Sequence, residues 1–86
     1  MDPVEINAGN WYLLAEDPEA WAADTGYHWS VREATTAAVE ATVQLRPDGT
    51  LTGTAEPGGS AALAAGSAAV RRCAEGAWGM TVTERP

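Results

Sequence analysis

The stretch that decides the fold runs from Val39 to Glu56 and reads VEATVQLRPDGTLTGTAE. From Val39 to Arg46 apolar and polar residues alternate, which is typical of a β-strand with one buried face. Pro47-Asp48-Gly49 predicts a tight turn, because proline presets φ and glycine accepts a positive φ. Thr50–Glu56 is then the returning strand, so the segment predicts a β-hairpin. The alanines before it also permit a helix over 35–41, but the unbroken alternation favours the strand.

Two strands and a short helix are predicted before this hairpin. Trp11–Ala15 is an apolar run, and Tyr27–Glu33 alternates aromatic or apolar residues with polar ones. Asp17-Pro18-Glu19 is a typical helix start, with an aspartate cap and a proline in the first turn. Thr25-Gly26 ends this helix after about two turns. A helix so short is unstable alone, so we expect Trp21 to dock it onto the rest of the fold.

A long helix and a last strand are predicted after the hairpin. Ser60 is placed to cap a helix that runs to about Glu75, and Gly76 is placed to end it. Glycine inside a helix costs about 1 kcal/mol relative to alanine, so Gly66 predicts a close approach of the helix to the sheet. Trp78–Thr83 reads as the last strand. The apolar stripe of the helix is expected to comprise Leu63, Gly66, Val70, Cys73 and Ala77.

This order of elements predicts one α+β domain over residues 1–86. We expect two layers: a mostly antiparallel sheet of four to five strands, one short N-terminal helix and one long C-terminal helix. A chain of 86 residues buries only about 60% of the surface that its unfolded form exposes. A thin core leaves an apolar face uncovered, which favours a homodimer or another homo-oligomer.

Composition excludes several functions. All five basic residues are arginine, so the chain holds neither a Schiff-base lysine nor a P-loop lysine. Twelve acidic residues against five arginines give a net charge of -7, which disfavours nucleic acid as a partner. One cysteine permits no internal disulfide and no multi-cysteine zinc site. No run approaches the roughly 18 apolar residues of a membrane helix, and the first residues do not resemble a signal peptide, so we expect a cytoplasmic protein that binds no membrane.

The charge is unevenly distributed. Residues 1–43 hold eight acids and one arginine, a net charge of -7, whereas residues 44–86 hold four of each and are neutral. The acidic half is either a surface that meets a basic protein or an ordinary solvated face. Glu16, Asp17 and Glu19 lie close together in this half. A role in stabilising the start of a helix is a simpler interpretation of these carboxylates than a metal site.

The tryptophans have two interpretations. The rings of Trp and Tyr supply bulky material for a core in a chain with few leucines and isoleucines, and both residue types are also enriched at interfaces. These aromatic residues are Trp11, Tyr12, Trp21, Tyr27, Trp29 and Trp78. A third use is to line a pocket for a small aromatic metabolite. His28 and Cys73 are the only histidine and thiol, but the strand pattern places His28 on a polar side and the helix pattern places Cys73 on an apolar one, which disfavours a nucleophile pair.

Several segments resemble the GNAT acetyltransferase superfamily. The segment HWSVREATT, residues 28–36, is similar to the family strand W-x-V-x-[ED]-A-x-T-G, and residues 60–74 resemble its cofactor helix. Residues 79–84, GMTVTE, are similar to the strand after that helix, and Asn10-Trp11-Tyr12-Leu13 with Asp17-Pro18-Glu19 to the first strand and helix start. The resemblance implies acetyl-CoA bound by backbone amides at Gly58, Gly59 and Ser60.

The chain departs from that family where the cofactor would be held. Ala61, Ala62, Leu63 and Ala64 stand where arginine and glycine are expected, so the resemblance implies a shortened, catalytically silent relative. The order of elements also resembles a double-stranded-RNA-binding fold, without its basic residues. The leading prediction is therefore a small, acidic, non-catalytic accessory module that needs no cofactor and binds a protein, possibly basic, through Trp11, Trp21, Trp29, Glu16, Asp17 and Glu19. The alternatives are an acyl-CoA-binding protein and a binder of a small molecule.

Overall fold

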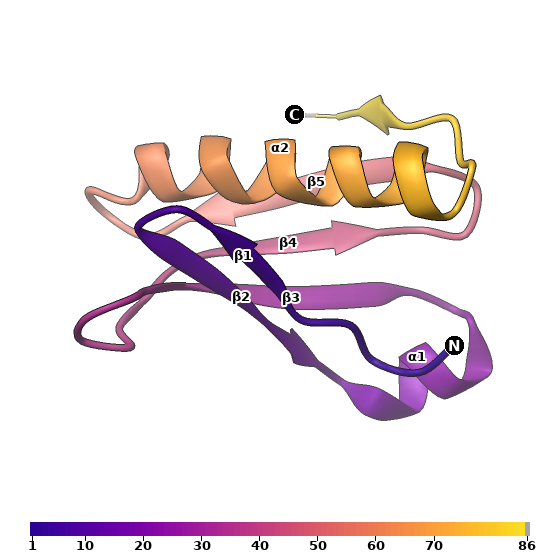
Figure 1. The fold of residues 1–86 in the computed structure, drawn as a ribbon, viewed down its shortest axis with the longest axis horizontal. Coiled ribbons are helices and arrows are strands. Elements are labelled where there is room, and N and C mark those ends of the chain that lie inside the picture. The colour runs from indigo at the N-terminus through magenta and orange to yellow at the C-terminus, as the bar shows by residue number, and fades with distance from the viewer. Residues whose placement is uncertain (86) are drawn as a thin grey trace.

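The computed structural model describes residues 1–85, which form one curled sheet with a long helix against one face (Figure 1). The strands lie in chain order from one edge of the sheet to the other. Every neighbouring pair is antiparallel except the last, which is parallel. The elements are β1 (Ile6–Ala8), β2 (Trp11–Glu16), α1 (Pro18–Ala23), β3 (Tyr27–Glu33), β4 (Val39–Leu45), β5 (Thr50–Ala55), α2 (Ser60–Ala77) and β6 (Thr83–Glu84). The α+β class, the mostly antiparallel sheet and the long C-terminal helix are confirmed.

The main core lies between α2 and the sheet. Strand register places Leu13, Val31 and Ala41 side by side on the face that α2 covers, and all three are fully buried. A Cβ added at Gly66 would lie 2.7 Å from the Val31 Cγ2 atom. The close approach predicted at Gly66 is therefore confirmed, and it brings the α2 backbone down onto β3 and β4.

An aromatic cluster docks α1, as expected of Trp21. This ring is fully buried, with its centroid 5.0 Å from those of both Tyr27 and Trp29. Trp29 Nε1 donates a 2.7 Å hydrogen bond to the Val4 carbonyl, which ties the N-terminal segment over the cluster. Edge-to-face aromatic pairs contribute about 0.5–1.5 kcal/mol beyond their buried area, so this cluster stabilises a helix of only six residues.

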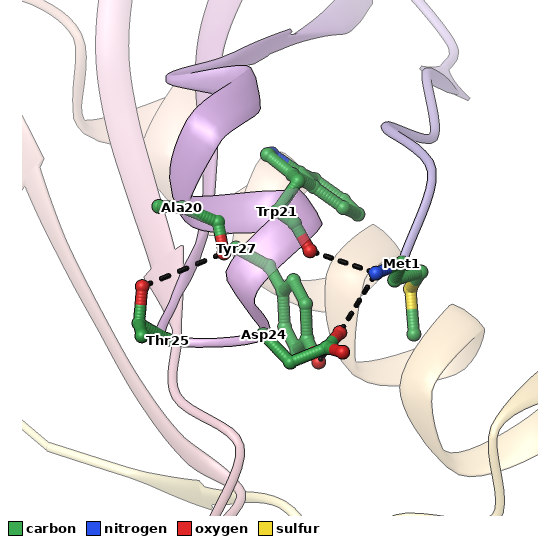
Figure 2. A network of polar contacts seen from close by, with 6 residues as sticks. All are labelled: Met1, Ala20, Trp21, Asp24, Thr25 and Tyr27. Atoms are coloured by element: carbon green, nitrogen blue, oxygen red, sulfur yellow. Dashed lines mark hydrogen bonds and ion pairs between the residues drawn. The ribbon is translucent and has the colours of Figure 1, made fainter.

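The N-terminal ammonium group adds a polar clamp to this cluster (Figure 2). The Met1 nitrogen donates to the Trp21 carbonyl at 2.7 Å and to Asp24 Oδ1 at 2.8 Å. The Tyr27 hydroxyl donates to the same carboxylate oxygen at 2.9 Å. The ammonium group, followed by the tyrosine hydroxyl, lowers the pKa of Asp24. Burial, followed by the bond to Asp24, raises the pKa of Tyr27.

Within residues 1–85 the sheet has six strands, more than the four to five expected. The added strand is β1, and it pairs with β2 through a two-residue turn at Gly9-Asn10 that sets Ala8 opposite Trp11. Gly9 has φ of 67°, the conformation that such hairpin turns require. Between Val4 and Ala8 half-buried apolar residues alternate with exposed polar ones. The segment is so short that this alternation is difficult to recognise in the sequence.

The predicted last strand, Trp78–Thr83, is wrong in its limits. The helix continues through Gly76 to Ala77, and the strand is reduced to Thr83–Glu84. Trp78 instead lies 6.4 Å from Trp21 between ring centroids, and the Met80 amide donates back to the Ala74 carbonyl. Packing of the Trp78 ring, together with a left-handed Gly79 at φ of 65°, turns the chain before it can pair.

The predicted helix caps are also corrected. Asp17 occupies the N-cap position of α1 in a left-handed conformation, φ of 56°, and its side chain makes no cap hydrogen bond. Ser60 is the first residue of α2 rather than its cap, which is Gly59. Thr25-Gly26 lies beyond the helix end, where Asp24 is the C-cap. The buried stripe of α2 is rotated from the expected one and comprises Ala62, Gly66, Ala69, Val70 and Ala74.

The segment that permitted either a helix or a strand is resolved in favour of the strand. Strand β4 begins at Val39, and residues 34–36 form a turn before it. The Glu33 carboxylate accepts hydrogen bonds from the Thr36 amide at 2.7 Å and the Thr35 amide at 2.9 Å. These bonds hold the turn and lower the pKa of Glu33.

Candidate functional site

The second face of the sheet is free of helices within residues 1–85. Trp21 docks α1 onto Tyr27 and Trp29, whose side chains belong to the face that α2 covers. Because side chains alternate along a strand, the opposite face carries the intervening residues. We call it the open face; it comprises Tyr12, Leu14, Glu16, His28, Ser30, Arg32, Thr42, Gln44, Thr52 and Thr54.

Two rows of side chains cross four strands on the open face. The strand register aligns Glu16, His28, Gln44 and Thr52 in one row. It aligns Leu14, Ser30, Thr42 and Thr54 in the next. Side chains directly opposite each other in neighbouring strands have Cβ atoms about 4.5–5.5 Å apart, so each row is a continuous strip.

A polar network fixes the carboxylate at the β2 end of the first row. Ser30 Oγ donates to Glu16 Oε2 at 2.6 Å, and Arg32 Nε donates to Ser30 Oγ at 3.0 Å. Arg32 also reaches Glu16 Oε2 with its terminal nitrogen at 3.4 Å. Ser30 is only 4% exposed, so its hydroxyl depends on this network for its hydrogen bonds. Both partners use Oε2, which leaves Glu16 Oε1 as an acceptor.

A cavity of about 390 Å³ lies on the open face. It is bordered by the β2–α1 junction at Glu16 and Asp17 and extends across β3 and β4 to β5. Asp17 is one of its lining residues, and the Asp17 side chain makes no cap hydrogen bond to α1. The lining residues are Glu16, Asp17, His28, Trp29, Thr42, Val43, Gln44, Thr52, Gly53 and Thr54. Such a cavity offers two carboxylates and several neutral polar groups to a ligand.

The predicted site residues lie in different environments. Glu16 and Asp17 meet at the cavity, while Glu19 is exposed on α1. Trp21 and Trp29 are buried in the core, as the core interpretation of these rings expects. Trp11 is half-buried, and its Nε1 donates to Glu40 Oε1 at 3.1 Å.

The sequence reasoning missed the neutral members of the cavity. Thr42 and Gln44 already stood on the polar side of the predicted strand, and Thr52 and Thr54 follow the same alternation after the turn. That pattern could have indicated one polar surface over the whole hairpin. It could not have shown that the surface is hollowed beside Asp17, because the side chain of Asp17 was expected at the helix cap.

Strand order turns the uneven charge of the sequence into an uneven charge in space. Because the strands lie in chain order, residues 1–43 build β1, β2, α1, β3 and most of β4. These residues carry the net charge of -7, and the neutral remainder builds the end of β4, β5, α2 and β6. We call the first part the acidic half. The cavity opens where Glu16 and Asp17 of the acidic half meet the hairpin.

The residues that the acetyltransferase resemblance assigns to acyl-CoA binding lie at the start of α2. Gly58 and Ser60 are exposed, whereas Gly59 is buried, and a Cβ there would lie 2.0 Å from the Glu40 carbonyl oxygen. A groove of about 550 Å³ between α2 and β5 borders Ser60 and also contains Arg71 and Arg85. Arg71 donates to the Val82 carbonyl and pairs with Glu84, each at 3.2 Å.

The structure also bears on three other features considered in the sequence: a His28–Cys73 pair, a metal site and a membrane helix. His28 lines the open face and Cys73 lies on α2, so the sheet stands between them, and burial raises the pKa of the thiol. In residues 1–85 no three His, Cys, Asp or Glu side chains converge as metal ligands would. Over the same residues no helix has the length and apolar character needed to cross a bilayer.

Comparison with known proteins finds no protein family, no curated protein and no solved structure that matches this chain. The resemblances to acetyltransferases and to double-stranded-RNA-binding domains therefore stay predictions that rest on short motifs.

Proposed function

We propose that this chain is a non-catalytic binding module that recognises a basic protein through its acidic half. The observation that supports the proposal is the segregation of charge, in which residues 1–43, the N-terminal segment, α1 and the strands at one side of the sheet, carry the whole net charge of -7. A concentrated field of one sign steers an oppositely charged partner toward one surface and repels partners of like charge.

The local pairing of charges in the acidic half agrees with this proposal. Its only arginine, Arg32, is already engaged by Glu16. Of the carboxylates, Asp24 is held by the N-terminal ammonium group and Glu33 by backbone amides. Asp17 and Glu19 are both exposed; Asp17 borders the cavity at the β2–α1 junction, and Glu19 lies in the first turn of α1. These two residues and Glu16 are the ones that we expect to contact the partner.

The experiment is a screen of arrayed peptides of varied charge against the intact chain. We expect bound peptides to be enriched in arginine and lysine, with binding that weakens as salt rises because exposed charges are screened. The test variant is E16Q/D17N/E19Q. The matched control is E56Q/E75Q/E84Q, which removes the same number of charges from the neutral half.

The two triple variants give opposite expectations. Binding of the basic peptides should fall at least tenfold in the first variant, because the carboxylates expected to contact the peptide are removed. A tenfold fall corresponds to a loss of about 1.4 kcal/mol of binding free energy. Binding should change less than twofold in the second variant, whose substituted residues lie outside the acidic half. The proposal fails if no basic peptide is bound, or if both variants lose binding equally. Equal loss would mean that net charge alone, rather than the acidic half, attracts the peptides.

The acyl-CoA alternative is supported by one observation, the groove that brings Ser60, Arg71 and Arg85 together. A ligand that binds the folded state raises its stability by mass action. Acyl-CoA binding therefore predicts a rise in melting temperature with millimolar coenzyme A, and a smaller rise in R71A. No rise in the wild-type chain would remove this alternative.

A further inference from the structure

We infer that the cavity on the open face binds the guanidinium group of an arginine side chain supplied by the partner. This inference rests on the proposed function and names the chemical group that the acidic half recognises. It begins from the cavity of about 390 Å³, whose size falls within the range of ordinary ligand pockets.

The charge of the cavity favours a cationic ligand. Glu16 and Asp17 are the charged residues among the lining side chains, and both are carboxylates. Glu16 is held in place by Ser30 and Arg32 through Oε2, so its other oxygen is oriented in advance. The Asp17 side chain makes no cap hydrogen bond to α1. A cationic group entering the cavity would therefore meet the Glu16 carboxylate, which is positioned before binding and shared with Arg32, beside the exposed residue Asp17, whose carboxylate carries no ion pair with Arg32.

The arrangement of polar residues along the cavity favours a planar guanidinium group over an ammonium group. The row that begins at Glu16 continues through His28, Gln44 and Thr52, so residues that carry acceptor groups follow one another across four strands rather than meeting at one point. A guanidinium group is planar and carries five donors in a fixed arrangement, whereas an ammonium group is a compact charge with strong hydration. Acceptors spread over a strip can satisfy several guanidinium donors at once. The open face already holds one such group, since Arg32 contacts both Glu16 and Ser30.

The experiment is an NMR titration of the intact, isotope-labelled chain with N-acetyl-arginine amide and, separately, N-acetyl-lysine amide. We expect the arginine probe to shift the amide signals of Glu16, His28 and Gln44, with an affinity roughly fivefold above that of the lysine probe. E16Q should weaken the arginine probe roughly tenfold, because a charge-assisted hydrogen bond becomes a neutral one. Glutamine can still accept from Ser30, and the dispersion of the signals shows that the variant is folded.

Two threonines on β5 supply a matched pair of variants. Thr54 lines the cavity, whereas Thr50 lies outside it on the same strand. T54V should weaken arginine binding about threefold, the loss of one hydrogen bond, and T50V should leave it unchanged. Equal responses to the two probes, shifts that lie away from the open face, or equal effects of T54V and T50V would overturn the inference.

The outcomes also separate this inference from the proposed function. If basic peptides bind and depend on the acidic half while the arginine probe leaves the open face unmoved, the proposed function stands and the guanidinium site is wrong. If the arginine probe binds the cavity but no arrayed peptide is bound, the site stands and recognition of a basic protein is wrong.

Discussion

Gly66 lies where the backbone of α2 comes nearest to the sheet. A methyl group there would contact Val31 at 2.7 Å, and a valine side chain has little freedom to move aside. We therefore predict that G66A lowers the free energy of unfolding by about 1–3 kcal/mol, the usual cost of overpacking, despite the better helix propensity of alanine. Urea denaturation followed by tryptophan fluorescence measures this change.

Gly76 is the matched control for that prediction. It lies in the same helix, and a Cβ added there would meet no atom within 4 Å. G76A should raise the free energy of unfolding by about 0.5–1 kcal/mol through helix propensity alone. If both substitutions stabilise the chain, the close packing at Gly66 is contradicted.

Some residue roles could be predicted from sequence and others could not. Gly66 was identifiable because a glycine inside a helix needs a steric reason, and Trp21 because a helix of two turns needs an anchor. The role of Asp17 could not be predicted. Asp-Pro-Glu is the usual signature of a capped helix start, and only the left-handed backbone of Asp17 diverts its side chain from the cap.

At the scale of elements, β6 depends most on a single side chain. Its backbone bonds include those from the Thr83 amide to the Gly49 carbonyl and from the Arg85 amide to the Leu51 carbonyl. Arg71 holds the same segment to α2 through the Val82 carbonyl and Glu84. We predict that R71A weakens this local structure by about 1 kcal/mol, since half-exposed ion pairs contribute little more.

Hydrogen–deuterium exchange checks this prediction. The Thr83 and Arg85 amides should exchange about fivefold faster in R71A, with the amides of β2, β3 and β4 unchanged. The neighbouring R72A is the control, because the Arg72 side chain is exposed and lies on the same turn of the helix. Faster exchange in both variants would mean that helix charge, rather than the contacts of Arg71, holds β6.

The long strands were predictable from sequence and the short ones were not. β3, β4 and β5 show alternation over six or seven residues, which few other structures produce. β1 has three residues and β6 has two, too few for a periodic signal. The turn at Gly9-Asn10 is a local hairpin signal, but the strand before it is too short to confirm it. The position of β6 depends on a tertiary contact, the packing of Trp78 on Trp21, that no local pattern encodes.

At the scale of the whole molecule, three carboxylates connect stability to pH. The N-terminal ammonium group lowers the pKa of Asp24, the Thr36 amide lowers that of Glu33, and the Thr50 amide lowers that of Asp48. A group whose pKa is lower in the folded state contributes stability above its unfolded value, here 3.8 for aspartate and 4.5 for glutamate, and loses it as pH falls through the folded value.

We therefore predict a melting temperature that is steady above about pH 5 and falls progressively below about pH 4. Thermal denaturation from about pH 6 to about pH 2.5 measures the profile. D24N should flatten part of the acid limb, because asparagine does not titrate. A profile of D24N as steep as that of the wild-type chain would show that the ammonium–Asp24 pair does not contribute.

The division of charge is the whole-molecule property that sequence came nearest to predicting. The unequal halves were visible in the residue counts, but their separation in space required strands in chain order, which the element pattern alone does not fix. The cavity needed more still, namely the register that aligns Glu16 with His28, Gln44 and Thr52.

The most direct test of the account is a map of amide shifts when the tightest-binding basic peptide is added to the labelled chain. We predict that the largest shifts lie in β2, α1, β3 and the cavity-lining residues of β4 and β5, centred on the β2–α1 junction, with α2 and β6 unmoved. Shifts centred instead on the groove beside Ser60 and Arg71 would contradict recognition through the acidic half.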